Sequence, residues 1–196
     1  MHVEHINIKF FVRKPELVNL EDFLSVFTQW IQQQACEGLL VDVADYRHVP
    51  AGPGVVLIGD EANYSMDCAG NRLGLLYNQK SSIDGSIQDR ISRTVRSALL
   101  ACRRLEEDPL LQGKLSFLGE EILLLVNDRL LAPNTEQTFL RLAPEVRSFF
   151  AELFDESDFT LSRDPDPRAR FNILVKAAGR LEVSRLLSNM SNQKPA

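Results

Sequence analysis

The chain has 196 residues, of which 44% are hydrophobic and 25% charged, as in an average globular protein and unlike disordered or fibrous chains. This length allows one sizeable core or two closely joined lobes. The formal charge of −5 at pH 7 repels phosphate backbones and argues against nonspecific nucleic-acid binding. The three cysteines are widely spaced and odd in number, so the sequence contains neither a disulfide framework nor a CxxC metal motif.

The N-terminal segment and the longest apolar run argue against export and membrane insertion. Residues 1–12 alternate polar with apolar side chains and include Glu4, whereas a signal peptide needs a basic start and a continuous apolar stretch. The longest apolar run, 122–126, covers five residues, and a membrane-spanning helix needs about 20. We therefore expect a cytoplasmic protein with neither a membrane nor a nucleic acid as partner.

The first quarter of the chain has the pattern strand, helix, strand. Apolar residues alternate over 6–12, which predicts a strand with one face on a core. After a helix-capping Asn19, apolar residues recur at three-and-four spacing and predict an amphipathic helix: Leu20, Phe23, Leu24, Phe27, Trp30 and Ile31. The run 39–44 is apolar on both sides apart from Asp42, as expected of a central strand.

A hairpin and a long helix follow. Residues 50–54 form a Pro- and Gly-rich turn, and the runs 55–59 and 73–77 predict the two arms of a hairpin, with residues around Tyr64 extending the first arm. The turn between the arms lies at 67–71. From about 84 to 107, apolar residues lie on one side at about 100° per residue, which predicts a long helix.

The second half repeats much of this order. Strands are expected at 121–126, 159–161 and 169–175, and helices at 135–154 and 181–190. Pro144 removes a hydrogen bond inside the first of these helices and predicts a kink or two short helices there.

These elements predict an α+β fold in which a mixed, largely antiparallel sheet is packed by amphipathic helices. We expect residues 1–190 to form a single compact domain and residues 191–196 a flexible tail. A strand-helix-strand-strand-helix unit would recur in 1–108 and 114–190, as a pseudo-duplication.

Reactive side chains are concentrated at the end of the predicted central strand: Asp42, Asp45, Tyr46, Arg47 and His48. An aspartate on an apolar strand is desolvated, which raises its pKa and would suit a general base. The alternative is that Asp42 forms a structural ion pair or accepts backbone donors. His48 would suit proton transfer, although loop histidines are usually only exposed. We take Asp42 and His48 as candidate catalytic residues, and Asp45, Tyr46, Arg47 and Tyr64 as candidate ligand-binding residues.

Two further clusters could bind ions. Asp60, Glu61, Tyr64 and Asp67 offer hard oxygen ligands, but their spacing matches no EF-hand loop, and a solvated hairpin face explains them as well. No metal site is therefore predicted. Arginines recur on the polar side of the long helix, opposite its apolar stripe: Arg90, Arg93, Arg96, Arg103 and Arg104. Their guanidinium groups could hold a phosphate or carboxylate, with Arg90 and Arg93 as the candidate ligand-binding residues, or they could form a solvated face.

The stretch VDVADYRHVPAGPGVVLIGDEANYSMD, residues 41–67, followed by RLGLLYNQK, resembles the signature stretch of a family of uncharacterised bacterial proteins. The resemblance implies a bacterial, cytoplasmic setting and no residue roles. The sequence has no GxxxxGK[ST], GxGxxG, HExxH or GxSxG motif, so no cofactor is indicated.

Two functions remain open. The first is a binding or interaction protein, expected to be a homo-oligomer, that holds a small anionic ligand or an acidic protein partner. The second is a hydrolase or lyase in which Asp42 or His48 moves a proton and Arg47 or a metal ion stabilises negative charge. The second requires Asp42, Arg47 and His48 to converge in one cleft, and the sequence alone leaves open whether the chain is an enzyme.

Overall fold

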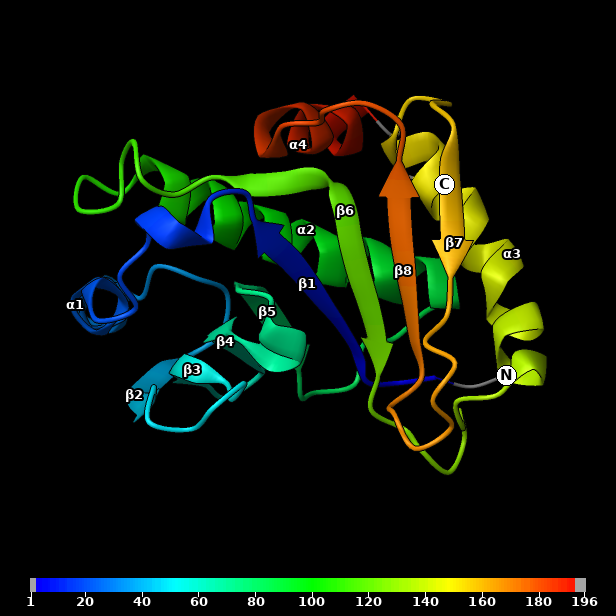
Figure 1. Ribbon diagram of the computed structural model, residues 1–196, viewed down its shortest axis with the longest axis horizontal. Coiled ribbons are helices and arrows are strands. Elements are labelled where there is room, and N and C mark those ends of the chain that lie inside the picture. Colours follow the sequence, from blue (N-terminus) through cyan, green and yellow to red (C-terminus); the bar gives the residue numbers. More distant parts are fainter. Residues whose placement is uncertain (1–2, 193–196) are drawn as a thin grey trace.

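A computed structural model describes residues 3–192 of the chain (Figure 1). The strands are β1 (Ile6–Val12), β2 (Leu40–Tyr46), β3 (Gly54–Gly59), β4 (Ala62–Asp67), β5 (Gly74–Gln79), β6 (Phe117–Val126), β7 (Phe159–Ser162) and β8 (Asn172–Ala177). The helices are α1 (Asp22–Gln33), α2 (Ile87–Glu107), α3 (Glu136–Leu153) and α4 (Val183–Asn192). Short 3-10 turns span Pro15–Leu17 and Ala69–Asn71.

The eight strands form one sheet in the order β2-β3-β4-β5-β1-β6-β8-β7, and every neighbouring pair is antiparallel. The predicted α+β fold with a largely antiparallel sheet is therefore confirmed. In the first half, α1 follows β1, the chain continues to the edge strand β2, and it returns through β3 and β4 to β5, which pairs with β1. In the second half, α3 follows β6, the chain continues to the edge strand β7, and it returns to β8, which pairs with β6. The first half has two strands more than the second, and the pseudo-duplication stays a prediction.

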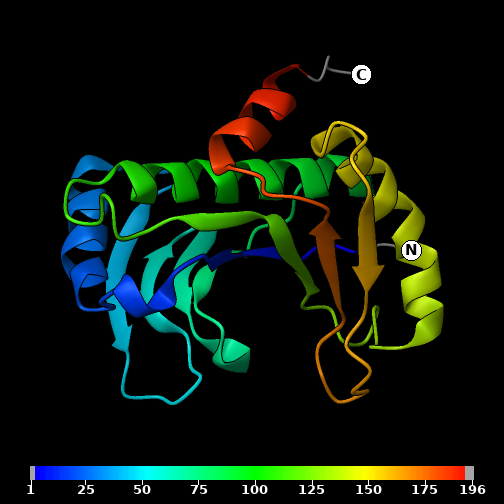
Figure 2. The ribbon, with the colours of Figure 1, turned by 45° about the horizontal axis from the view of Figure 1, so that its top comes forward.

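The helices lie over one face of the curved sheet (Figure 2). Helix α1 packs on β2 and β3, α2 on β1 and β5, α3 on β7, and α4 on α2 and β6. Their apolar sides share one continuous core with the inward-facing strand residues. Within residues 3–192, no helix combines the length and apolar character needed to cross a bilayer.

The structure reverses two predictions about strand position. The 39–44 run was expected in a central strand, yet β2 is the edge strand and Asp42 is exposed. The 6–12 segment was expected to have one solvated face, yet all seven residues of β1 are buried. The polar residues of β1, Asn7 and Lys9, are buried too, and the Lys9 ammonium contacts Asp67 and the carbonyl oxygen of Ala69.

The predicted hairpin is a three-stranded meander. A two-residue connection, Asp60 and Glu61, joins β3 to β4, which is a full strand containing Tyr64. The carboxylate of Asp60 accepts hydrogen bonds from the backbone N–H groups of Leu39 and Glu61, at 2.7 and 2.8 Å. The connection contains none of the Gly or Asn residues that favoured hairpin turns require, so the sequence offered no indication of it.

Most helix predictions agree with the structure to within a few residues. Helix α2 begins after Ser86, whose hydroxyl accepts the N–H of Asp89 while the Asp89 carboxylate accepts the N–H of Ser86, as in a capping box. Helix α3 is continuous through Pro144, so the alternative of two short helices is wrong. Helix α4 extends to Asn192, which places the start of the predicted tail in a helix, and residues 193–196 lie outside the described residues.

Gly54 permits the close pairing of β3 with β4. Its φ is +64°, and a Cβ there would lie 2.1 Å from the carbonyl oxygen of Met66. We expect Gly54→Ala to lower the free energy of unfolding by about 3 kcal/mol, from left-handed strain and a backbone clash together. Urea denaturation measures this. In the control variant Gly70→Ala, φ is +69° but no atom lies within 4 Å of the added Cβ, so the loss should be about 1 kcal/mol. Equal losses would contradict the clash.

Candidate functional site

A cavity of about 660 Å³ opens between the C-terminal halves of α1 and α2. Helix α1 packs on β2 and β3, and α2 packs on β1 and β5. Strand β4 lies between β3 and β5, and its residue Tyr64 forms the floor of the cavity. The apolar lining residues are Trp30, Ala35, Leu100, Ala101 and Pro109. The polar and charged ones are Gln29, Gln33, Cys36, Glu37, Tyr64, Ser97, Arg103, Arg104, Glu107 and Asp108. This volume is typical of a site for a small molecule.

The floor is aromatic and rigid. The Tyr64 ring meets Trp30 edge-on at 6.3 Å and Tyr77 edge-on at 5.1 Å between centroids. The Tyr77 hydroxyl donates to the side-chain oxygen of Gln79 at 2.7 Å. Such edge-to-face packing fixes ring orientation, so the floor can present a preformed surface to a ligand.

The titratable groups of the floor remain neutral near pH 7. Burial raises the pKa of the Cys36 thiol to about 11, against lesser opposing effects of a Tyr64 hydrogen bond and the charge of Arg104. Burial also raises the pKa of Tyr64 well above its ordinary value and that of Tyr77 to about 12. A thiol with so high a pKa is a poor nucleophile at neutral pH. These groups are therefore unsuited to nucleophilic catalysis near neutral pH.

The rim carries two arginines from the last turns of α2. Arg103 and Arg104 are exposed, and the Arg104 guanidinium lies 5.9 Å from the centre of the Trp30 ring. Within the described part of the chain, neither guanidinium forms an ion pair with a carboxylate. Some exposed arginines do form one, such as Arg72 with Glu121 at 2.8 Å, whereas among the described residues Arg93 and Arg96 on the same helix do not. The rim thus offers two unpaired cations beside apolar surface.

The structure does not bring the predicted catalytic residues to this cavity. Asp42 is exposed on the edge strand, and its carboxylate accepts the N–H of Val43 at 2.8 Å. The expected desolvation of Asp42 is therefore wrong. His48 is also exposed, with its ring 6.4 Å from that of Tyr46, and neither residue lines the cavity. A catalytic role for Asp42 and His48 stays a prediction.

Asp45 and Arg47 form a local ion pair at the same end of β2. The Arg47 guanidinium donates to both carboxylate oxygens of Asp45 at 2.9–3.1 Å, and Glu21 lies 3.7 Å away. This hydrogen bonding lowers the pKa of Asp45 to about 2. The pair is open to solvent, so Arg47 already has a carboxylate partner and lies outside the cavity. None of the residues predicted at the strand end lines the cavity, whereas Tyr64, predicted as a ligand-binding residue, does.

The predicted arginine face of α2 divides into three parts. Arg90 is buried, and its guanidinium donates to the carbonyl oxygens of Ile83 at 2.8 Å and Val3 at 2.7 Å. This residue fixes the N-terminal segment against the helix start, so its predicted place on an exposed polar face is wrong. Arg93 and Arg96 are exposed but lie outside the cavity lining. Only the C-terminal pair, Arg103 and Arg104, reaches the cavity.

A buried ion pair lies on the helix-free face. The Lys9 ammonium is 2.5 Å from the Asp67 carboxylate, with side chains only 3% and 8% exposed. Asp67 was predicted on a solvated hairpin face with Asp60 and Glu61, and the structure contradicts this for Asp67. The pair could not be predicted because it joins residues 58 positions apart through the pairing of β4, β5 and β1.

Stability should depend on pH through Lys9. Burial is the largest influence on its pKa and lowers it below 10.5, although Asp67 opposes this. Between the lowered pKa and 10.5 the unfolded chain therefore binds more protons than the folded one, and this group makes stability rise with pH. We expect a contribution of at most about 1.4 kcal/mol per pH unit in urea denaturation as the pH rises toward 10.5. The double variant Lys9→Met/Asp67→Leu should lack this contribution to the rise of stability with pH. If stability depends on pH in that variant as it does in the wild type, the contribution does not come from Lys9.

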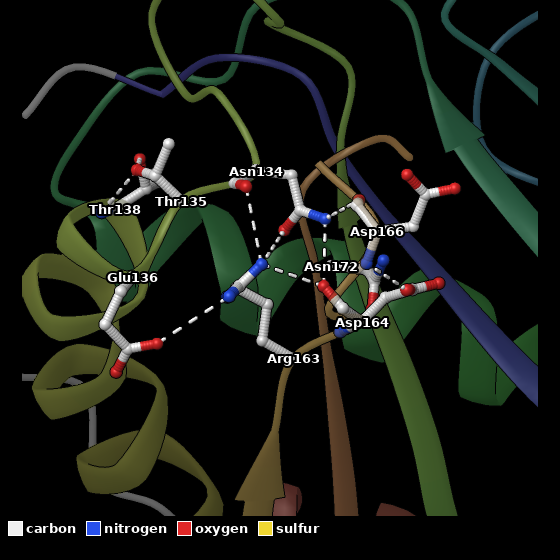
Figure 3. Close-up of polar contacts among 8 residues, drawn as sticks. All are labelled: Asn134, Thr135, Glu136, Thr138, Arg163, Asp164, Asp166 and Asn172. Atoms are coloured by element: carbon white, nitrogen blue, oxygen red, sulfur yellow. Dashed lines mark hydrogen bonds and ion pairs between the residues drawn. The ribbon is translucent and has the colours of Figure 1, made fainter. Parts of the chain in front are cut away.

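A second polar cluster joins the loop before α3 to the loop between β7 and β8 (Figure 3). The buried Asn134 amide donates to the carbonyl oxygens of Asp164 and Asp166 at 3.0 and 2.7 Å, and its oxygen accepts from Arg163 at 3.1 Å. Arg163 also reaches Glu136 in the first turn of α3 at 3.7 Å. The side-chain amide of Asn134 is thus fully used within the protein, where it fixes the two loops against each other.

Comparisons with protein-family models, curated proteins and solved structures found no match, so the cavity between α1 and α2 must be interpreted from its own residues.

Proposed function

We propose that the protein is a binding protein for a small amphipathic ligand with an anionic group, held in the cavity between α1 and α2. The observation that carries this proposal is the pair of unpaired guanidinium groups, Arg103 and Arg104, at the rim of a preformed cavity with an aromatic floor. A guanidinium binds carboxylate or phosphate bidentately. Trp30 and Leu100 offer the apolar surface that would contact the rest of the ligand.

Binding also fits the floor better than catalysis does. Cys36 and Tyr64 stay protonated near neutral pH, so neither is an activated nucleophile or a general base there. Ser97 and the two glutamines offer neutral hydrogen-bonding groups, which would orient a ligand.

A thermal-shift screen tests the proposal with three amphipathic monoanions: octanoate, phenylacetate and N-(4-methylpentanoyl)leucine. A ligand present at 100 times its Kd should raise Tm by about 5–10 °C, since binding to the native state stabilises it by mass action. Arg103→Ala and Arg104→Ala should each weaken binding about tenfold or more.

Arg93→Ala is the matched control, because Arg93 is exposed on the same helix but outside the cavity. This variant should bind like the wild type. Absence of any shift with all three probes, or equal losses in Arg93→Ala and Arg103→Ala, would refute the proposal.

The expectations of a bacterial cytoplasmic setting and a homo-oligomer belong to the same proposal. Light scattering on the purified protein tests the second, and a molar mass near the 22.1 kDa of one chain would refute it.

A further inference from the structure

The cavity carries charges of both signs. Besides Arg103 and Arg104, its lining includes Glu37 from the loop after α1 and Glu107 from the last turn of α2. Both glutamates are exposed, and within residues 3–192 neither carboxylate forms an ion pair or a side-chain hydrogen bond. Two guanidinium groups and two carboxylates thus line one cavity, and within residues 3–192 no ion pair joins them.

The opposite charges act on the same buried groups. Burial is the main cause that raises the pKa of the Cys36 thiol, and to a lesser degree Glu37 raises it further while Arg104 lowers it. Glu37 also contributes to the raised pKa values of Tyr64 and Tyr77, after burial as the largest cause. The electrostatic influence of Glu37 therefore reaches the cavity floor, where a bound ligand would lie.

The end of α2 adds to the negative side of the site. The helix ends at Glu107, and Asp108, which follows it, also lines the cavity. The last carbonyl groups of a helix lack intrahelical partners and carry a partial negative charge, so they favour a cation nearby. A purely anionic ligand would make no ion pair with Glu37 or Glu107.

We infer that the ligand is a zwitterion of the amino-acid or short-peptide class, with its carboxylate at Arg103 and Arg104 and its ammonium group at Glu37 and Glu107. This inference rests on the proposed function, because it assigns the anionic group to the same guanidinium groups. The apolar side chains of such a ligand would contact Trp30 and Leu100, and a cavity of about 660 Å³ has room for a dipeptide.

Three matched probes test the inference by calorimetry at pH 7 and low ionic strength. Leucyl-leucine carries both charges, N-(4-methylpentanoyl)leucine lacks only the ammonium group, and leucine 3-methylbutylamide lacks only the carboxylate. We expect leucyl-leucine to bind about tenfold more tightly than either singly charged probe, because only it pairs with both sets of side chains.

Variants assign each charge to its partner. Glu37→Gln and Glu107→Gln should each weaken leucyl-leucine binding several-fold and leave the affinity for N-(4-methylpentanoyl)leucine unchanged or higher. Arg103→Ala should weaken the binding of both leucyl-leucine and N-(4-methylpentanoyl)leucine. Glu152→Gln, an exposed change on α3, should alter neither. Tm of each variant without ligand shows that the fold is retained.

The outcomes separate this inference from the proposed function. N-(4-methylpentanoyl)leucine could bind as tightly as leucyl-leucine, with neither affinity changed by Glu37→Gln or Glu107→Gln. That result would refute the zwitterionic ligand and leave the anionic ligand of the proposed function standing. If no probe binds, both are refuted.

Discussion

Asp67→Asn should lower the free energy of unfolding by about 3–5 kcal/mol, which is among the largest effects expected for a single substitution outside the apolar core. The change removes the negative charge beside the Lys9 ammonium, and both side chains are almost fully buried. A buried ammonium without a counter-charge must either remain desolvated and unpaired or lose its proton.

Loss of that proton limits the penalty. Starting from 10.5, deprotonation at pH 7 costs about 4.8 kcal/mol, since each of the 3.5 pH units corresponds to about 1.36 kcal/mol. The Lys9 pKa is already lowered by burial, so part of this cost is present in the wild type. The expected range therefore ends near 5 kcal/mol.

Urea denaturation at pH 7 measures the effect, and two controls isolate its cause. Asp60→Asn changes an exposed aspartate in the neighbouring turn and should cost less, since its oxygen still accepts the N–H groups of Leu39 and Glu61. Lys9→Met/Asp67→Leu replaces both charges by apolar groups and should lie within about 2 kcal/mol of the wild type. A loss below about 1 kcal/mol in Asp67→Asn would show that the pair is not buried as described.

This ion pair illustrates which parts of the fold the sequence could predict. Periodicity places all four α-helices and seven of the eight strands, all but β4, because it reports local apolar faces. It cannot report the order of strands in a sheet. The apolar run around Asp42 therefore suggested a central strand and the alternation in β1 a half-exposed one, whereas the pairing of β1 with both β5 and β6 makes β1 central.

The candidate site was predictable only in part. Tyr64 and the arginines of α2 were recognised by their chemistry, but the cavity includes Arg103 and Arg104 and not Arg90 or Arg93. The difference depends on α1 lying opposite the C-terminal half of α2 across the cavity, which is a tertiary property. Cys36 and Glu37 lie in a short loop without a motif, so no pattern in the sequence indicated them.

Phe27→Ala should lower the free energy of unfolding by about 3–5 kcal/mol, because it empties a large volume in a core that has little freedom to collapse. Phe27 is 0% exposed, and its ring lies 5.9 Å from that of Phe23 and 5.5 Å from that of Trp30. Gln32→Ala, on the exposed face of the same helix, is the control and should change stability by no more than about 0.5 kcal/mol. A loss below about 1 kcal/mol in Phe27→Ala would show that the buried face of α1 is misplaced.

The same substitution links the core to the cavity. Trp30 packs on Phe27 on one side and on Tyr64 on the other, so the ring that lines the cavity is held in place by the ring beneath it. The milder variant Phe27→Leu retains most of the volume and should remain folded at 25 °C. If the cavity binds its ligand as a preformed surface, Phe27→Leu should weaken binding of leucyl-leucine although residue 27 does not contact it, and the affinities for the two singly charged probes should fall by a similar factor.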